Sequence, residues 1–298
     1  MLFLQTIRQN YVGGIFMGDY FCGWYFRCQS DSQTLAVIPA VHKSGTEQSC
    51  SIQLITDHAS WNISFPITDF QKSGPVVQIG ENRFSPQEMR LELYAAGLRT
   101  SGSLQFGPLT PIGYDIMGPF CWVPGMECRH SVFSMKHSVN GEMIINGETY
   151  LFHDGTGYWE GDRGRSFPEK YAWTQCSFPD GAVMLSVAEI PLGRLHFTGT
   201  IGVVLWHGKQ YRLATYLGAQ VIRNRRGEIV VRQGGLQLTV RQLEDAPQPL
   251  AAPTGGAMVR TIHEHAACRA FYCFQSGGSI LFALEAPNAA FEYEFFRE

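Results

Sequence analysis

The sequence predicts an all-β fold, and three observations support that prediction. The chain has 298 residues, of which only 16% are charged, while 13% are aromatic and 32 residues are glycine. Apolar and polar residues alternate with period two along most of the chain, and no segment carries an amphipathic helical stripe over about eleven residues. Glycine and Asn-Gly turn signals separate the alternating runs. Short, regularly spaced strands of this kind indicate a barrel or a sandwich, and the length suits two domains or one large β domain.

The first clear strand candidate is the aromatic segment FCGWYFRC near the N-terminus. Trp24 and Phe26 alternate there with Tyr25 and Arg27, which is the pattern of a strand that presents two different faces. The interpretation from packing alone is an inter-strand ladder of rings in which Arg27 bonds backbone carbonyl groups.

The one helix candidate is Ser85–Ala96, where the letters SPQE have the form of a capping box with proline at the first helical position. Apolar Met89, Leu91 and Leu93 nevertheless occupy every second position of this segment. Because that spacing places them on one face of a strand, we predict a strand here.

Two Asn-Gly pairs, Asn140-Gly141 and Asn146-Gly147, lie between apolar runs and predict type I′ hairpin turns. The turns would join residues 131–139, 142–145 and 148–152 into a meander. Further strands, separated by Gly or Arg-Gly turns, are predicted at Ala182–Glu189, Leu195–Leu205, Lys209–Thr215, Ala219–Ile222, Glu228–Arg232 and Leu236–Gln242.

The C-terminal part contains one segment rich in Pro, Ala and Gly, Ala246–Ala257, which is predicted to be a loop. A final return runs from Met258 to Phe296. We expect two β domains, residues 1–137 and 138–298, with the C-terminal strands free to return to the first domain.

Charge and compartment signals exclude several classes of function. There are 23 Lys and Arg residues against 26 Asp and Glu residues, and no block of five like charges, so nucleic acid is not an expected partner. No apolar run approaches the roughly 18 residues of a membrane-spanning helix. The N-terminus has no apolar region long enough for a signal peptide, which predicts a cytoplasmic protein. The eight cysteines are therefore expected to be free, mostly buried thiols.

Nucleotide and metal motifs fail on spacing. The glycines of residues 155–161 leave one residue too many for a dinucleotide fingerprint, and no G-x-S-x-G nucleophile motif occurs. His263 and His265 flank Glu264 and share one strand face, but no third ligand is apparent, so a polar strand face is favoured over a zinc site. We predict no metal and no cofactor.

The segment GYWEGDRGRSFPEKYAWTQC carries the densest chemistry of the chain. If it is extended, Tyr158, Glu160 and Asp162 point to one face, and Trp159 and Arg163 point to the other. Two carboxylates about 7 Å apart on an aromatic-lined face repel each other, and loss of solvent raises the pKa of at least one of them. A carboxyl group that keeps its proton at neutral pH is what a general acid requires. An ordinary ion-paired corner with the neighbouring arginines is the open alternative.

Two further groups of residues have the character of a binding site. Tyr171, Trp173 and Gln175 share a strand face that suits an apolar pocket with two polar groups, although buried rings are more often plain core. The segment GPFCWVPGMECRH carries Trp122 and His130. An imidazole titrates near neutrality, so His130 is either an acid–base group or a structural histidine.

These segments, together with NGEMIINGE and VAEIPLGRLHFTGTIGVVLWHGKQYRLATYLGA, resemble the tocopherol cyclase family in order and spacing over roughly residues 20–265. The resemblance implies two lipocalin-like antiparallel β domains, as in carotenoid hydratase and attachment-type relatives. For plant and cyanobacterial members it also implies closure of a prenylated hydroquinone to a chromanol, an isomerase reaction. The short chain, the eight cysteines and the lack of a transit-type N-terminus point to a bacterial member.

The implied chemistry assigns roles to the polar residues. An acid protonates the trisubstituted alkene nearest the ring, the phenol oxygen captures the tertiary cation, and a base takes the phenol proton, so no cofactor is required. Glu160 or Asp162 is the expected acid, and Tyr158 and His130 are expected to be polar partners or the base.

Aromatic rings are expected to stabilise the cation in a cavity that excludes water. Trp159 can line the same cavity as Glu160 only if Gly161 forms a β-bulge. The expected substrate contacts are Trp122, Trp159, Trp173, Tyr171, Gln175 and Trp24.

The sequence leaves two other functions open. A lipocalin-like carrier would bind a hydrophobic, prenylated small molecule without using the carboxylates, and a hydratase would let water capture the cation. An enzyme is favoured over a carrier because of the carboxylates. Contact of an apolar rim with a membrane surface also stays open.

Overall fold

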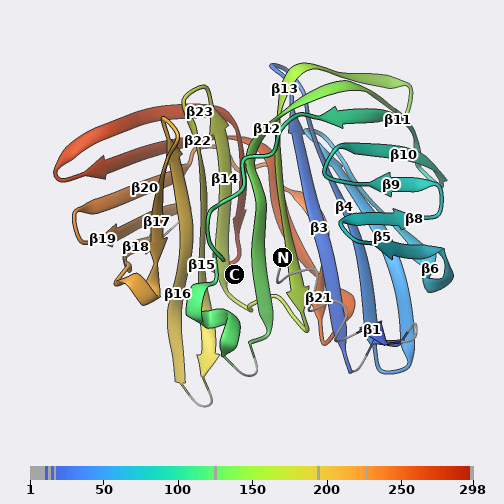
Figure 1. The fold of residues 1–298 in the computed structure, drawn as a ribbon, viewed down its shortest axis with the longest axis horizontal. Coiled ribbons are helices and arrows are strands. Elements are labelled where there is room, and N and C mark those ends of the chain that lie inside the picture. The colour runs from blue at the N-terminus through green and yellow to red at the C-terminus, as the bar shows by residue number, and fades with distance from the viewer. Residues whose placement is uncertain are drawn as a thin grey trace. The chain divides into compact units, whose positions relative to one another are not determined.

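The computed structural model describes residues 11–12, 15–16, 18–123, 126–192, 195–225 and 227–295. The described chain is built of β-strands and three short 3-10 turns, which confirms the all-β prediction (Figure 1). The elements up to β13 are β1 Tyr11–Val12, β2 Ile15–Phe16, β3 Tyr20–Gln29, β4 Thr34–Ser44, β5 Glu47–Thr56, β6 Ser60–Pro66, η1 Ile67–Asp69, β7 Phe70–Ser73, β8 Val76–Ile79, β9 Asn82–Phe84, β10 Glu88–Ala95, β11 Leu98–Phe106, η2 Gly118–Trp122, β12 Cys128–Ile145 and β13 Glu148–Gly164. The remaining elements are β14 Tyr171–Phe178, β15 Gly181–Leu192, β16 Leu195–Trp206, β17 Lys209–Ala214, η3 Thr215–Leu217, β18 Gln220–Arg225, β19 Glu228–Gln233, β20 Leu236–Gln242, β21 Gln248–Thr254, β22 Ala257–Ser276 and β23 Ser279–Tyr293.

The strands form two large antiparallel sheets. The first has the order β6-β5-β4-β3-β13-β12-β11-β10-β9-β8-β7, and the second has the order β17-β16-β15-β14-β23-β22-β20-β19-β18, with β21 paired to β22. Neighbours in the sheets are mostly neighbours in sequence, as expected for hairpin-connected strands. The result is a lipocalin-like all-β fold.

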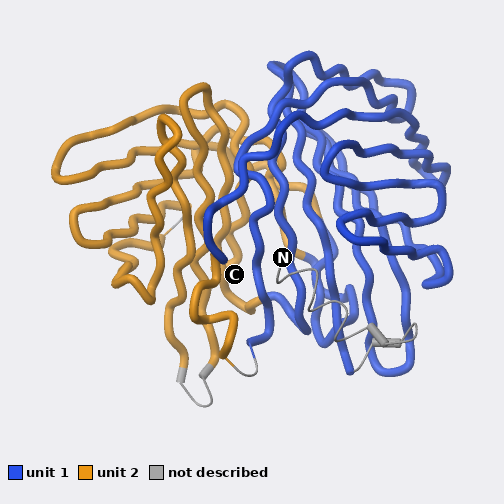
Figure 2. Tube along the Cα trace, in the orientation of Figure 1, with its two compact units in different colours: residues 1–115, 124–167, 250–261 blue, residues 116–123, 168–249, 262–298 orange. Residues whose placement is uncertain are grey.

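The chain forms two compact units that are not continuous in sequence (Figure 2). Unit 1 contains residues 1–115, 124–167 and 250–261, and unit 2 contains residues 116–123, 168–249 and 262–298. The structure therefore does not divide at residue 137, because β12 runs through that position and pairs with β13 along most of its length. Residues 250–261 of the C-terminal part belong to unit 1.

The core of unit 1 lies on one face of its sheet and is rich in aromatic rings. It includes Trp24, Phe26, Leu35, Ile52 and Met143, each less than 4% exposed. The opposite face of the central strands is buried as well, since nine of the ten residues of β3 are buried. Several polar side chains of that second face, among them Arg27 and Glu160, are therefore shielded from bulk water.

Unit 2 has a core of its own. Its fully buried members include Leu185, Val231, Tyr272, Phe274 and Phe291. All of Tyr171–Cys176 in β14 is buried, so this strand too has two buried faces.

The two Asn-Gly pairs have different outcomes. Asn146 and Gly147 form the predicted two-residue turn between β12 and β13, with φ of 51° and 89°. The turn predicted at Asn140 and Gly141 is wrong, because both residues lie inside β12. The pairing register with β13 shifts between Val139 and Gly141, so the pair marks a β-bulge.

Two other local predictions are also decided by the structure. The segment around Met89 is a strand, β10, as predicted. The loop predicted over residues 246–257 is wrong, because it contains strand β21. The side-chain amide of Gln53 donates to the Ala251 carbonyl (2.9 Å) and accepts from the Ala251 N–H (2.8 Å), so this Pro-containing strand is fixed by contacts that composition does not reveal.

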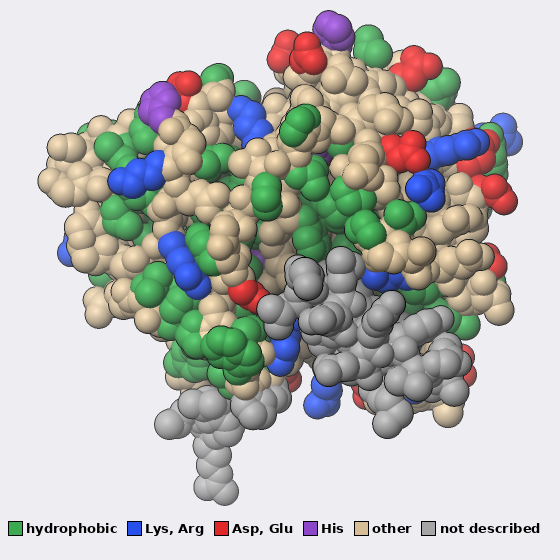
Figure 3. Space-filling view, viewed as in Figure 1, with side chains coloured by type: hydrophobic (Ala, Val, Ile, Leu, Met, Phe, Trp, Pro, Cys, Tyr) green, Lys and Arg blue, Asp and Glu red, His purple; other side chains and the backbone are tan. Residues whose placement is uncertain are grey.

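The cysteines and the surface charges can be compared with what the composition predicts. All eight cysteines are free thiols, as predicted, and five of them are buried. Among the described residues, no helix has the length and hydropathy needed to cross a membrane. On the described part of the face shown in Figure 3, acidic and basic side chains are scattered among uncharged ones.

Candidate functional site

A hairpin of two long strands positions the candidate site in unit 1. In the β12–β13 pairing, His130 lies directly opposite Asp162, and Val132 lies opposite Glu160. Because side chains alternate along a strand, Tyr158, Glu160 and Asp162 all lie on the second face of the sheet, away from the core of unit 1. The predicted sharing of one face by these three residues is therefore confirmed.

The side chains on this face form a connected polar cluster. His130 Nδ1 lies 3.0 Å from Asp162 Oδ1, and His130 Nε2 lies 3.0 Å from Glu160 Oε2. The hydroxyl of Tyr158 donates a hydrogen bond to Glu160 Oε2. The Cys128 thiol donates to Asp162 Oδ1 at 3.4 Å. The imidazole is thus held between two carboxylates, and the four residues expected to carry acid–base chemistry lie together.

Burial differs between the two carboxylates. The side chains of His130 and Glu160 are 9% and 6% exposed, whereas that of Asp162 is 22% exposed. Tyr158 is 1% exposed. Of His130, Glu160 and Asp162, the carboxylate of Asp162 is therefore the group that solvent or a ligand reaches most easily.

The electrostatics of the cluster favour a charged imidazole. Burial by itself lowers the pKa of His130, but the charges of Glu160 and Asp162 outweigh it and raise this pKa well above its ordinary value. Burial, followed by the charge of Glu160, raises the pKa of Tyr158, so its hydroxyl remains a donor. Burial and Asp162 likewise raise the pKa of the Cys128 thiol.

The same three groups are the ones that could hold a metal ion. One ligand atom from each of His130, Glu160 and Asp162 lies within 4.8 Å of the others. Both imidazole nitrogens are, however, already directed at carboxylates. A cation beside Glu160 and Nε2 would keep Asp162 as the partner of Nδ1 and would gain only two ligands, fewer than the three or four of protein zinc sites. The donor set fits proton chemistry better than a metal centre.

The tryptophans expected beside Glu160 lie elsewhere. Trp159 is in the core of unit 1, with its ring 5.1 Å from that of Phe26 and 4.6 Å from that of Phe133. The pairing of β13 with β3 runs without a register shift through Gly161, so the bulge that Trp159 would need is absent there. Trp24 is also in this core, stacked on a neighbouring phenylalanine. Both predictions are corrected: alternation puts these rings on the face opposite the carboxylates.

Trp122 does not line an enclosed cavity either. It ends the 3-10 turn η2 in unit 2 and is 76% exposed. A ring in that position is in contact with solvent, which corrects the expectation of a buried cavity ring.

The other expected substrate contacts belong to unit 2. Tyr171, Trp173 and Gln175 share the second face of β14, as predicted, and all three are buried. The Tyr171 hydroxyl donates to Glu292 Oε2, and the Gln175 amide donates to Ser177 Oγ at 2.9 Å. Their assignment as substrate contacts stays a prediction.

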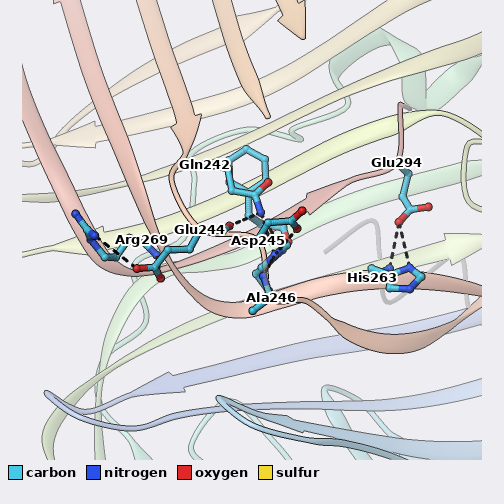
Figure 4. Close-up of polar contacts among 9 residues, drawn as sticks. Gln242, Glu244, Asp245, Ala246, His263, Arg269 and Glu294 are labelled. Carbon is cyan, nitrogen blue, oxygen red and sulfur yellow. Dashed lines mark hydrogen bonds and ion pairs between the residues drawn. The ribbon is translucent and has the colours of Figure 1, made fainter. Parts of the chain in front are cut away.

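The His-Glu-His sequence in β22 does not bring its two imidazoles to one centre. His263 Nδ1 lies 3.9 Å from Glu294 Oε1 (Figure 4). His265 instead accepts the Ala246 N–H at Nε2 and lies 3.4 Å from Asp245 Oδ1. Figure 4 shows these two groups of contacts apart from one another. The interpretation as a polar strand segment holds better than a metal site.

Sequence reasoning missed a second pair of carboxylates. Glu264 and Glu292 lie directly opposite each other in the β22–β23 pairing, and both are buried. They are 28 positions apart in the chain, and three register shifts separate them from the hairpin turn, so strand pairing could not be counted from sequence. The Cys128 contact was also missed, although its place two residues before His130 put it on the same strand face.

Comparisons with known proteins address the fold. No family model matches the chain, and a search of curated protein sequences finds no match. Among solved structures, an AttH protein from Nitrosomonas europaea is similar with a TM-score of 0.55 and 12% identity, over 94% of this chain and 93% of the other. CghA is similar with a TM-score of 0.59 and 9% identity, over 93% and 88%, and CghA with Sch210972 gives 0.59 and 10%, over 93% and 89%. At these identities the likeness shows a shared fold.

Proposed function

We propose that the protein is a tocopherol cyclase-like enzyme that adds a proton to an alkene of a hydrophobic, prenylated substrate. The observation that carries the proposal is the imidazole of His130 held 3.0 Å from both Glu160 and Asp162 on a buried sheet face. A buried group of this kind stores and transfers protons without a cofactor.

The charge of the cluster explains how it holds a transferable proton. With His130 charged and both carboxylates ionised, the three groups carry one net negative charge. Uptake of one proton makes the cluster neutral, which burial favours. Asp162, as the most exposed member, is the group that we assign to deliver this proton.

The proposed reaction balances without any oxidant or reductant. The O–H bond of the Asp162 carboxyl breaks as a C–H bond forms at the less substituted alkene carbon, and a tertiary cation remains. The phenol oxygen of the same substrate forms a C–O bond to that cation, and its proton returns to the Asp162 carboxylate. Tyr25, opposite Glu160 in the β3–β13 pairing, offers an aromatic ring for the cation.

The second candidate is a carrier for a hydrophobic small molecule. It is favoured by one comparison, since one of the similar structures is CghA with Sch210972, a protein of this fold with a small molecule. A carrier would need the apolar and aromatic surroundings but not the proton of the cluster.

The test uses purified protein with a prenylated methylhydroquinone, with Asp162→Asn and Glu160→Gln in parallel. Asp154→Asn is the matched control, because Asp154 lies on the same strand but is exposed. Chromanol that forms with wild type and the control, and disappears with Asp162→Asn, supports the cyclase. A product heavier by one water indicates a hydratase, and equal saturable binding by all variants without product favours the carrier.

A further inference from the structure

Gly23 interrupts an otherwise buried stretch of the second face of unit 1. It is the one residue of β3 that is not buried. In β4, Ile38 is likewise the one residue of Thr34–His42 that is partly exposed. Both lie on the face opposite the core of unit 1, which takes Cys22, Trp24 and Val37 from the same strands.

The register places this accessible spot beside the candidate acid. Gly23 pairs with Asp162 on β13 and with Ala40 on β4. A Cβ atom on Gly23 would lie 3.7 Å from the side chain of Ile38. Asp162, Gly23 and Ile38 therefore adjoin, and each is partly exposed among buried neighbours.

Neither backbone strain nor crowding explains a glycine at this position. Gly23 is absent from the described residues with positive φ, so its backbone suits any residue. The atoms nearest to a Cβ there would be Ala40 Cβ, Ile38 Cγ2 and the Pro39 carbonyl oxygen, at 3.6, 3.7 and 3.9 Å, which are ordinary contacts.

The nearby Gly161 is different. A Cβ on Gly161 would lie 2.8 Å from the Gly23 carbonyl oxygen and 3.1 Å from the Phe133 ring, so the fold itself requires glycine there. A glycine inside a strand weakens that strand and often marks the close approach of a ligand. At Gly23 the fold does not require glycine, so the close approach of a ligand is the reason that fits this position.

We propose that Gly23 is the specificity-determining residue of the site, and that the methyl-branched alkene of an isoprenoid chain lies over it, against Asp162 on one side and Ile38 on the other. The inference rests on the proposed function and names the part of the substrate that the site selects. A methyl branch fills the volume that a Cβ would occupy, so the site prefers branched chains over linear chains of equal length.

The experiment compares wild type with Gly23→Ala and Gly23→Val, using a phytyl-substituted methylhydroquinone and the linear hexadecyl analogue as binding probes. We expect each variant to fold, with an unchanged or higher Tm for Gly23→Ala. For Gly23→Val, affinity for the branched probe falls by about tenfold and affinity for the linear probe falls much less. Ile38→Ala added to Gly23→Val restores part of the affinity for the branched probe, because it returns the space beside residue 23.

The outcomes separate this inference from the proposed function. Chromanol formation from an alkene-bearing substrate, with a branched-to-linear affinity ratio that Gly23→Val leaves unchanged, overturns the inference alone. A ratio that depends on residue 23, without any product, supports the inference and counts against the cyclase. Failure of wild type to bind either probe overturns both.

Discussion

Replacing His130 with glutamine removes the positive charge from between the carboxylates of Glu160 and Asp162 and so changes how stability depends on pH. The pKa of His130 is raised well above its ordinary value in the folded protein. A group of this kind contributes stability that is fully present below the unfolded pKa of about 6.5 and is lost as pH rises through the folded pKa. Wild type should therefore lose stability above neutral pH, and His130→Gln should not show that loss.

The size of the effect follows from the geometry. Each carboxylate oxygen lies 3.0 Å from an imidazole nitrogen. At an effective dielectric constant of about 20, the Coulomb attraction of each contact is about 5.5 kcal/mol, which the cost of burying the charges largely offsets. Removing one partner of a buried ion pair costs about 3–5 kcal/mol, so we expect that loss for His130→Gln at pH 6.5. One linked proton gives at most about 1.4 kcal/mol per pH unit, so wild type should lose about 1 kcal/mol between pH 7 and pH 8.

Urea unfolding at half-unit steps from pH 5 to pH 9 measures both quantities. His42→Gln is the matched control, because burial lowers the pKa of His42 to about 4 and its ring nitrogens lie 3.2 and 3.0 Å from the hydroxyls of Ser49 and Ser51. Because the pKa of His42 is lowered, the stability that His42 contributes to the folded protein is lost as pH falls from 6.5 toward 4. This pH dependence is opposite to that caused by His130. His42→Gln should therefore keep the alkaline loss and reduce the acidic one. An alkaline loss that is equal in wild type and His130→Gln would show that His130 is not charged between the two carboxylates.

Three further outcomes are expected. Gly157→Ala should destabilise the protein by about 1–3 kcal/mol in urea unfolding, because its Cβ would overlap the His137 imidazole. Adding His137→Ala should recover part of that loss, and additive effects of the two changes would contradict the contact. Tyr158→Phe should cost about 1.5–3 kcal/mol, measured in the same way, because it removes a buried hydrogen bond to a carboxylate; a change below about 0.5 kcal/mol would argue against that bond. Gln53→Leu should release the backbone of Ala251, so hydrogen exchange of the Ala251 amide should become faster than in wild type, and unchanged protection would show that β21 is held by other contacts.

Local alternation predicted a large part of the site. It placed Tyr158, Glu160 and Asp162 on one face, since side-chain direction in a strand depends only on the count of residues. It also predicted that Trp159 could lie on the face of Glu160 only with a β-bulge at Gly161. Without that bulge, the Trp159 ring packs in the core. Alternation could not predict that His130 lies opposite Asp162, because the β12–β13 register contains three shifts.

Turns and boundaries failed where long-range pairing overrides local signals. Asn146-Gly147 forms a turn, whereas the similar Asn140-Gly141 continues a strand, because residues 139–145 pair with β11 on their other side. The expected boundary after residue 137 followed the meander, but the hairpin of β12 and β13 keeps residues up to 167 in unit 1. Both errors come from contacts between residues far apart in sequence.

In the proposed reaction, the cluster of His130, Glu160 and Asp162 delivers a proton to a carbon atom of a prenyl chain. Turnover of a prenylated methylhydroquinone in D2O reports on this proton transfer, because a C–D bond formed in the reaction survives isolation whereas O–D groups exchange back. We predict one deuterium per product molecule, on the carbon next to the ring-closing position, and no labelled product with Asp162→Asn. Unlabelled product, or labelled product formed equally well by Asp162→Asn, would contradict this proton transfer.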